Sequence, residues 1–148
     1  GKQEKIHPYD YEKETVSAGT EAKIFKTSCK FGIMICYDTV FPGVAQMLVN
    51  KGAEILFSPS RIVKEGIEPW KMYVQVRSLE NRIPIIAPNV ENTKFGGNSM
   101  IIELVKEEKI VKTKITKLEG EFEMSADIIL SNYKEIRRQR SEDRNKFQ

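Results

Sequence analysis

Residues 31–42 read FGIMICYDTVFP, an apolar run that stops at a cysteine and continues through two polar residues to a proline. The apolar part is typical of a strand that is covered on both faces of a sheet. Pro42 suits the first position of a helix. A turn between a buried strand and a helix exposes its side chains at the sheet edge, where backbone N–H groups can bind an oxyanion. The pattern makes Cys36 a candidate nucleophile; the alternative is an inert core thiol.

Composition places the chain among ordinary globular proteins. Its 148 residues fit one domain, with 40% hydrophobic and 30% charged residues. The net charge of +3 comes largely from residues 134–140, which we interpret as a solvated helix face of mixed charge. No aromatic or glycine-rich RNA-binding pattern accompanies this basic stretch, so we expect no nucleic-acid partner.

The chain contains two cysteines, Cys29 and Cys36, and one histidine, His7. This set is too small for a structural zinc site. The cysteines are seven residues apart in what reads as one strand segment, which places them on opposite faces and argues against a disulfide. No apolar run approaches the ~18 residues of a membrane span, and no signal peptide is visible. We therefore expect no membrane association and a cytoplasmic location.

Apolar segments alternate with breakers in the order strand, helix, strand, helix, strand, which predicts an α/β layered sheet. Gly52 follows the first helix where a C-terminal capping glycine belongs. Two substantial helices and a terminal one cannot cover both faces of buried strands, so we expect the chain to pack against another polypeptide or to belong to a larger domain. The predicted helices are 42–50, 69–82 and 132–140, and the predicted strands are 22–27, 30–36, 54–58, 83–87, 98–104, 108–115 and 122–129.

Several separate motifs occur in the order of a known family, and together they are more specific than any one of them. The chain resembles the nitrilase superfamily of carbon–nitrogen hydrolases from about residue 4 to about residue 130. The motifs are Lys5-Ile-His7, Glu12-Lys13 before Gly19, the nucleophile segment 32–42, the helix end and strand 52–60, Trp70 with Arg77-Ser-Leu-Glu80-Asn81, Ala87-Pro88-Asn89, and the segment 96–102.

The resemblance implies a fold and an activity. The fold would be a four-layer α-β-β-α sandwich, of which residues 1–148 supply the C-terminal portion and the N-terminal portion is not in this chain. The activity would be hydrolysis of a non-peptide carbon–nitrogen bond, with amides preferred over nitriles, through a thioester-type intermediate on cysteine. No metal or organic cofactor is implied. Expected partners are a small-molecule amide or nitrile, the N-terminal half of the same domain, and a second copy in a homo-oligomer.

Residue by residue, the resemblance implies Cys36 as the nucleophile and Lys5 as the lysine that stabilises the oxyanion. Glu12 matches an additional glutamate that helps to position substrate and lysine. The glutamate that acts as general base in the family lies upstream of the lysine segment, and no glutamate of this chain matches it. The backbone N–H of Tyr37 would assist at the oxyanion, and Glu80 and Asn81 would brace the fold beneath the nucleophile.

Two departures from the family pattern stand out. Gly43 occupies a position where the family usually has glutamate after Phe-Pro, and charged residues 103–109 replace a Pro/Gly turn, so the hairpin there should be longer or distorted. Arg61, Lys64 and Lys94 lie in the loops that could shape a pocket, which admits an acidic substrate. A Cys–His dyad through His7 is an alternative for the chemistry. A non-catalytic fragment or family member that serves as a binding or assembly module is the alternative for the whole chain.

Overall fold

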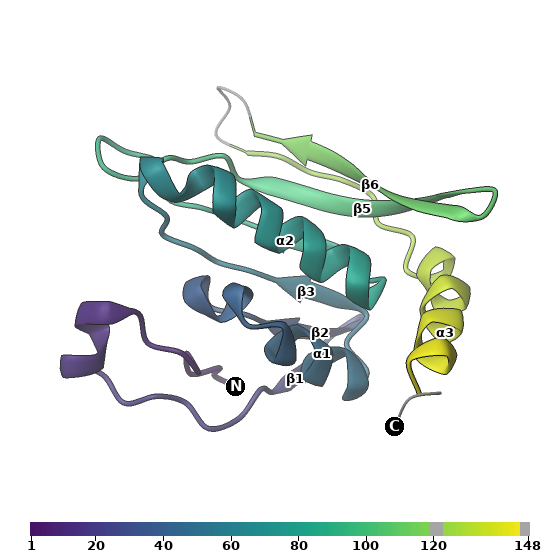
Figure 1. Ribbon diagram of the computed structural model, residues 1–148, viewed down its shortest axis with the longest axis horizontal. Helices are drawn as coiled ribbons and strands as arrows, with labels where there is room; N and C mark the ends of the chain where they lie inside the picture. The colour runs from purple at the N-terminus through teal and green to yellow at the C-terminus, as the bar shows by residue number, and fades with distance from the viewer. Residues whose placement is uncertain (119–122, 146–148) are drawn as a thin grey trace.

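The structure is a computed structural model that describes residues 1–118 and 123–145. It contains a six-stranded mixed sheet in which the strands lie side by side in chain order (Figure 1). The middle pairs β2–β3 and β3–β4 are parallel, and the other neighbours are antiparallel. The strands are β1 (Ile24–Lys26), β2 (Lys30–Ile33), β3 (Ile55–Phe57), β4 (Ile85–Ala87), β5 (Met100–Glu107) and β6 (Ile110–Lys117).

Two α-helices make the crossovers that parallel strands require. Helix α1 (Pro42–Asn50) has the predicted bounds, with Pro42 at its first position and Gly52 beyond its end at a φ of +96°. Helix α2 (Ile67–Asn81) begins two residues before the predicted Pro69, because the short 3-10 helix η3 (Lys64–Gly66) leads directly into it. The prediction of an α/β fold is confirmed.

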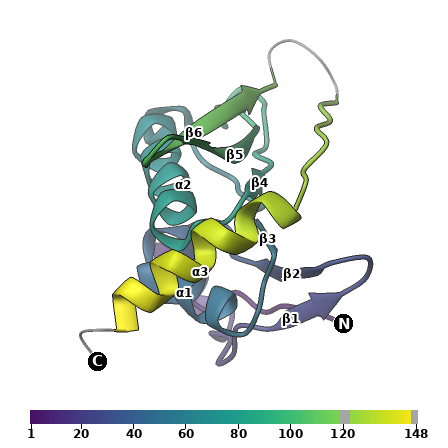
Figure 2. The ribbon, with the colours of Figure 1, turned by 90° about the vertical axis from the view of Figure 1, so that its right-hand side faces the viewer.

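Both crossover helices cover the same face of the sheet (Figure 2). Contact there is close, since a Cβ built on Gly32 of β2 would lie 2.7 Å from Cδ2 of Leu48 in α1. Side chains alternate between the two faces of a strand, so the neighbours of Gly32 point to the other face. The fully buried side chains of the covered face include Leu48, Leu56, Val74, Ile85, Met100 and Ile102.

The opposite face is apolar as well, yet no helix of the described residues covers it. Phe31 packs there against Phe25 and Phe57, with ring centroids 5.4 Å apart in each pair. These rings remain half-buried, together with Ile33 and Ile86. The sheet therefore has one face that the crossover helices cover and one apolar face that no helix of the described residues covers.

Several predicted strands are shorter or placed differently. The first four are trimmed at their ends, and β2 stops at Ile33, so Cys36 lies in the 3-10 helix η2 (Cys36–Val40) instead of the predicted strand 30–36. Cys29 occupies the bend before β2, so the prediction that both cysteines belong to one strand is wrong. Both thiols are free, as expected.

The C-terminal part differs most from the prediction. In the hairpin, β5 extends further toward the turn than the predicted 98–104, and β6 starts later than the predicted 108–115. β5 and β6 pair as far as Glu107 and Ile110, and the turn lies at Glu108, with a φ of +53°. The predicted strand 122–129 is wrong over its described residues, 123–129: Ile128 packs against Leu104 and Tyr133 and does not pair with β6. Phe122 lies outside the described residues.

Helix α3 (Ser131–Asn145) is longer than the predicted 132–140. It closes the end of the sheet opposite Cys36, where the Arg137 guanidinium donates hydrogen bonds to the carbonyls of Ala53, Glu54 and Arg82. In the described part of the chain, no helix is both long and apolar enough to cross a membrane.

Candidate active site

Cys36 stands at the carboxyl end of the parallel strands, in the connection between β2 and α1. The backbone N–H of Met34 donates to Phe57 and that of Cys36 donates to Pro59, both at 2.9 Å, so the chain follows β3 for two residues beyond β2 and then turns. Cys36 has a φ of +52°. A non-glycine residue in this left-handed region is strained by about 1–3 kcal/mol, and such strain concentrates at functional sites. The half-buried thiol is thus held at the first residue of η2.

Arg77 of α2 holds η2 in place by hydrogen bonds. Its side chain is buried, and its guanidinium donates to the carbonyls of Thr39 and Val40 at 2.9 Å each. The third donor reaches the Glu80 carboxylate at 2.8 Å. The Asn81 side-chain amide donates to the carbonyl of Arg77 at 3.0 Å and to Glu80 at 3.3 Å. Glu80 and Asn81 therefore contact the residue that braces the Cys36 turn.

Lys5 lies on the segment before the sheet and forms an ion pair with Glu12, of the short 3-10 helix η1 (Asp10–Glu14). Glu12 also accepts the backbone N–H of Tyr9 at 2.6 Å. The hydrogen bond from Lys5 is the main cause that lowers the pKa of Glu12, the Tyr9 N–H adds to it, and the charge of Arg61 contributes. Glu12 is therefore an ionised partner of Lys5 at neutral pH.

Asp38 connects the lysine segment to the cysteine turn. Its fully buried carboxylate accepts the backbone N–H groups of Ile6 and His7 from the lysine segment and that of Ile35 from the turn. Nδ1 of His7 lies 3.0 Å from the same carboxylate, and the imidazole stacks on Phe41 with ring centroids 3.7 Å apart. Nδ1 of His7 is therefore engaged with Asp38.

The loops that follow β3 and β4 reach the same end of the sheet as Cys36. The guanidinium of Arg61 lies over the ring of Phe95, 4.6 Å from its centroid. Asn89 ties the loops together, since its side chain accepts the N–H of Ile62 at 2.8 Å and donates to the carbonyl of Gly97 at 2.6 Å. The charge of Arg61 is the smallest of the causes that lower the pKa of Glu12.

The sequence reasoning named Cys36, Lys5, Glu12, Tyr37, Glu80 and Asn81 but gave no role to the two residues that join them, Asp38 and Arg77. The polar interruption after Cys36 contained Asp38, and an arginine on an otherwise core-facing helix could have drawn attention to Arg77. The ring of Tyr37 packs edge-on against Tyr9 and Phe41, so this residue also links the lysine segment to η2.

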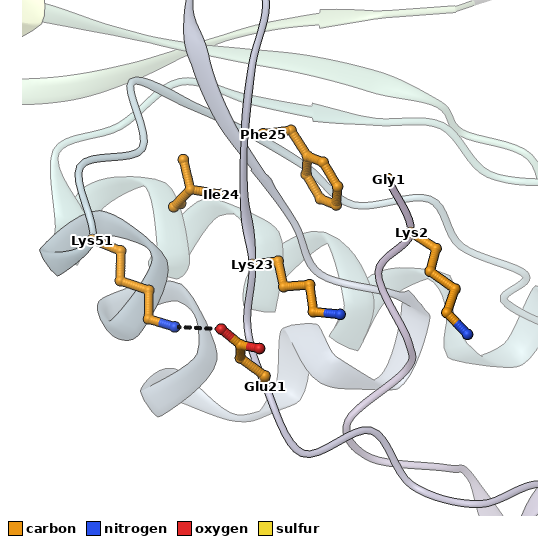
Figure 3. A pocket seen from close by; sticks show the side chains of 7 residues that line it. All are labelled: Gly1, Lys2, Glu21, Lys23, Ile24, Phe25 and Lys51. Carbon is orange, nitrogen blue, oxygen red and sulfur yellow. Dashed lines mark hydrogen bonds and ion pairs between the residues drawn. The ribbon is translucent and has the colours of Figure 1, made fainter.

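A separate surface hollow lies beside β1 (Figure 3). Lys51 pairs there with Glu21, and Phe25 lies on the opposite side of the hollow. None of the residues that the sequence proposed for chemistry lines it, so we do not assign the reaction to it. Among the described residues, no three His, Cys, Asp or Glu side chains gather as a metal-binding group.

Comparisons with known proteins show what the chain is similar to. The sequence profile described as carbon-nitrogen hydrolase matches residues 1–105, so β6 and α3 lie beyond the matched part. A probable nitrilase of Schizosaccharomyces pombe is 33% identical over 129 residues, which are 84% of this chain and 47% of that protein. A deaminated glutathione amidase of Synechocystis sp. is 32% identical over 117 residues, covering 67% of this chain and 43% of the relative.

Solved structures show the same fold. A carbon-nitrogen hydrolase from Helicobacter pylori G27 matches with a TM-score of 0.68 and 25% identity, over 91% of this chain and 53% of that one. In each of these three comparisons, this chain spans about half the length of the protein that it matches.

Proposed function

Since this chain belongs to the carbon–nitrogen hydrolase family, we propose that it serves the hydrolysis of a non-peptide carbon–nitrogen bond, an amide in preference to a nitrile, with Cys36 as nucleophile. The observation that carries the proposal is the strained Cys36 turn, which Asp38 ties to the segment that bears the Lys5–Glu12 pair. Acyl transfer needs a positioned nucleophile and a group that stabilises the oxyanion. Cys36 would be the nucleophile, and Lys5, on the segment fastened to its turn, would stabilise the oxyanion.

In the proposed reaction, the Cys36 thiolate attacks the amide carbonyl and forms a C–S bond while the carbonyl oxygen gains the negative charge. The Lys5 ammonium and the backbone N–H of Tyr37 stabilise this oxyanion. The first N–H groups of a helix lack partners within it, which suits the position of Tyr37 as the second residue of η2. The C–N bond then breaks, the amine leaves with a proton, and water hydrolyses the remaining thioester.

Glu12 supports Lys5 in this scheme. Its carboxylate is held by Lys5 and by the Tyr9 N–H, and its lowered pKa makes it a poor proton acceptor. We therefore give Glu12 a positioning role. Glu4, the neighbour of Lys5 in sequence, pairs with Lys2 at 2.9 Å on the surface. The general base that takes the thiol proton and activates water would come from a glutamate outside these residues.

We further propose that the chain corresponds to the C-terminal portion of one hydrolase domain. The open apolar face around Phe31 supports this, because a second sheet packed on it would complete a four-layer α-β-β-α sandwich. The N-terminal portion of the domain would then be the partner that covers Phe31 and supplies the glutamate. A homo-oligomer and a cytoplasmic location complete the proposal.

A substrate that carries a carboxylate fits the loop charges. Arg61 is exposed and is oriented by its contact with Phe95. A guanidinium binds a carboxylate with two parallel hydrogen bonds, which fixes orientation as well as charge. Arg61 would therefore anchor the acidic end of the substrate while its amide lies at Cys36.

The first experiment measures the denaturing intact mass of every polypeptide in the purified protein. Ammonia release is then measured on amides, nitriles and N-carbamoyl acids for the wild type and for Cys36→Ala, with Cys29→Ala as the matched control. We expect a component that supplies the missing glutamate, turnover that Cys36→Ala abolishes, and full activity in Cys29→Ala. Turnover that survives Cys36→Ala would contradict the mechanism.

The second candidate function is a non-catalytic binding or assembly module. The observation that favours it is that Glu12 is engaged with Lys5 and has a lowered pKa, so this carboxylate is a poor general base. This function predicts one species of 17.0 kDa, no turnover, and alkylation of Cys36 by iodoacetamide at neutral pH that is no faster than that of Cys29.

A further inference from the structure

We propose that Asp38 is a positioning residue of the reaction, whose buried carboxylate fastens the Lys5 segment to the Cys36 turn and so sets the lysine against the nucleophile. The inference rests on the proposed function for the roles of Lys5 and Cys36. Asp38 takes part in no chemical step of the proposed reaction, because it acts only through the two segments that it joins.

The contacts of Asp38 converge from two parts of the chain. Oδ1 accepts the His7 backbone N–H at 2.8 Å and lies 3.0 Å from Nδ1 of the same residue. Oδ2 accepts the N–H of Ile6 at 3.3 Å and that of Ile35 at 3.1 Å. His7 is 31 positions away in sequence and Ile35 only three, so one carboxylate bridges the lysine segment and the strand end.

A carboxylate is the side chain that this position requires. Four donors point at its two oxygens, and an ionised carboxylate accepts on both oxygens and donates on neither. Because Asp38 is an acceptor, Nδ1 of His7 carries the hydrogen. Hydrogen bonds to a charged acceptor are about twice as strong as neutral ones. They also offset the cost of burying the charge of a residue that is 0% exposed.

Aromatic contacts also hold the lysine segment against η2. The imidazole of His7 stacks on Phe41 at an interplanar angle of 12°, and the ring of Tyr9 packs edge-on against Tyr37. Lys5 is then fixed at its free end by Glu12, which in turn is held by Tyr9. The lysine segment can therefore move away from η2 only by breaking the Asp38 hydrogen bonds.

Asp38→Asn tests this arrangement with nearly the same shape. One oxygen becomes an amide that donates, so at least one of the donors now faces another donor. We expect faster hydrogen exchange of the backbone amides in residues 5–9 (Pro8 has none), among which His7 loses the protection that Asp38 gives it. We also expect slower alkylation of Cys36 by iodoacetamide at pH 7, because an ammonium near a thiol favours the reactive thiolate.

The measurements are made on the whole chain in a Cys29→Ser background, so that alkylation reports Cys36. Lys5→Met gives the rate expected when the cation is lost, a fall of roughly tenfold. Leu104→Ala is the control for general destabilisation, because Leu104 belongs to the cluster under α3 and touches neither segment. If Asp38→Asn does not fold, His7→Phe keeps a ring on Phe41 and removes only the Nδ1 contact, with smaller changes in the same direction.

The proposal is supported if Asp38→Asn raises exchange at residues 5–9 and lowers the alkylation rate toward that of Lys5→Met, while Leu104→Ala does neither. It is overturned if exchange at residues 5–9 is unchanged or rises equally in Leu104→Ala. It is also overturned if Asp38→Asn alkylates at the wild-type rate, or if Lys5→Met does. Absent amide turnover with these differences intact would refute only the hydrolase function.

Discussion

Replacement of Arg77 by methionine tests whether a buried guanidinium supports the Cys36 turn. Arg77 is 5% exposed and donates to two carbonyls of η2 and to Glu80. Thr39 is fully buried, so its carbonyl would lose its partner, and an unsatisfied buried acceptor costs about 1–3 kcal/mol. Val40 is half-buried and its carbonyl can regain water, so its loss is smaller. Methionine keeps most of the apolar stem, and we expect a total loss of about 2–4 kcal/mol.

Urea denaturation followed by the fluorescence of Trp70 measures this loss. Trp70 is the single tryptophan, it is 4% exposed, and it lies on the same helix as Arg77. The slope of the transition should stay constant while the midpoint falls. A domain of ordinary stability, about 5–15 kcal/mol, remains folded after such a loss.

Arg138→Met is the matched control. Arg138 also forms ion pairs, with Glu135 and Glu142, but on the exposed surface of α3. Solvent screens these pairs, so we expect no measurable change in the free energy of unfolding. A loss below about 1 kcal/mol in Arg77→Met, or equal losses in the two variants, would refute the reasoning about the buried carbonyls.

Three further predictions concern the same region. The pKa of Glu12 is held below its ordinary value of 4.5, so its carboxylate stabilises the fold above that pH and ceases to do so as the pH falls through the lowered value. Urea titrations at several pH values should therefore show the full difference in the free energy of unfolding between wild type and Glu12→Gln at neutral pH, and no difference in acid. A difference that does not depend on pH would argue against the ion pair. Gly32→Ala brings a Cβ to 2.7 Å from a Leu48 methyl group and should cost about 1–3 kcal/mol in thermal melts, whereas Gly43→Ala, whose Cβ meets no atom within 4 Å, should be neutral or stabilising. Arg61→Ala should raise KM about tenfold for amides that carry a carboxylate and leave neutral amides unaffected; equal effects on both classes would exclude the anchor.

The local signals of the sequence were sufficient for both ends of the first helix. Pro42 and Gly52 mark the two ends of α1, and its observed bounds are the predicted ones. The α/β class followed from the alternation of apolar strands with helices, and it is confirmed. The roles of Cys36 and Lys5 stay predictions, although the structure ties the Lys5 segment to the turn that carries Cys36.

Other features depended on contacts that a local pattern does not report. The apolar run through Ile35 predicted a strand up to Cys36, yet β2 ends at Ile33. Hydrogen bonds to the β3 side continue as far as Cys36, where the chain enters the turn that Asp38 and Arg77 hold. The segment 122–129 was predicted as a strand, but in its described part Ile128 packs against the cluster of Leu104, Tyr133 and Ile136.

The sequence by itself determined the α/β class and which segments must be buried, because residue type and short-range spacing fix the hydrophobic pattern; Cys36 as nucleophile and, through the resemblance, Lys5 as the cation stay predictions. Only the tertiary structure decided that a buried aspartate joins the lysine segment to the cysteine turn, that an arginine braces the turn from below, and that one face of the sheet is left open. These are contacts between residues some 30 or more positions apart, as with His7 and Asp38 at 31 and Arg77 and Thr39 at 38. Their formation depends on how the sheet and helices pack, which no local pattern encodes.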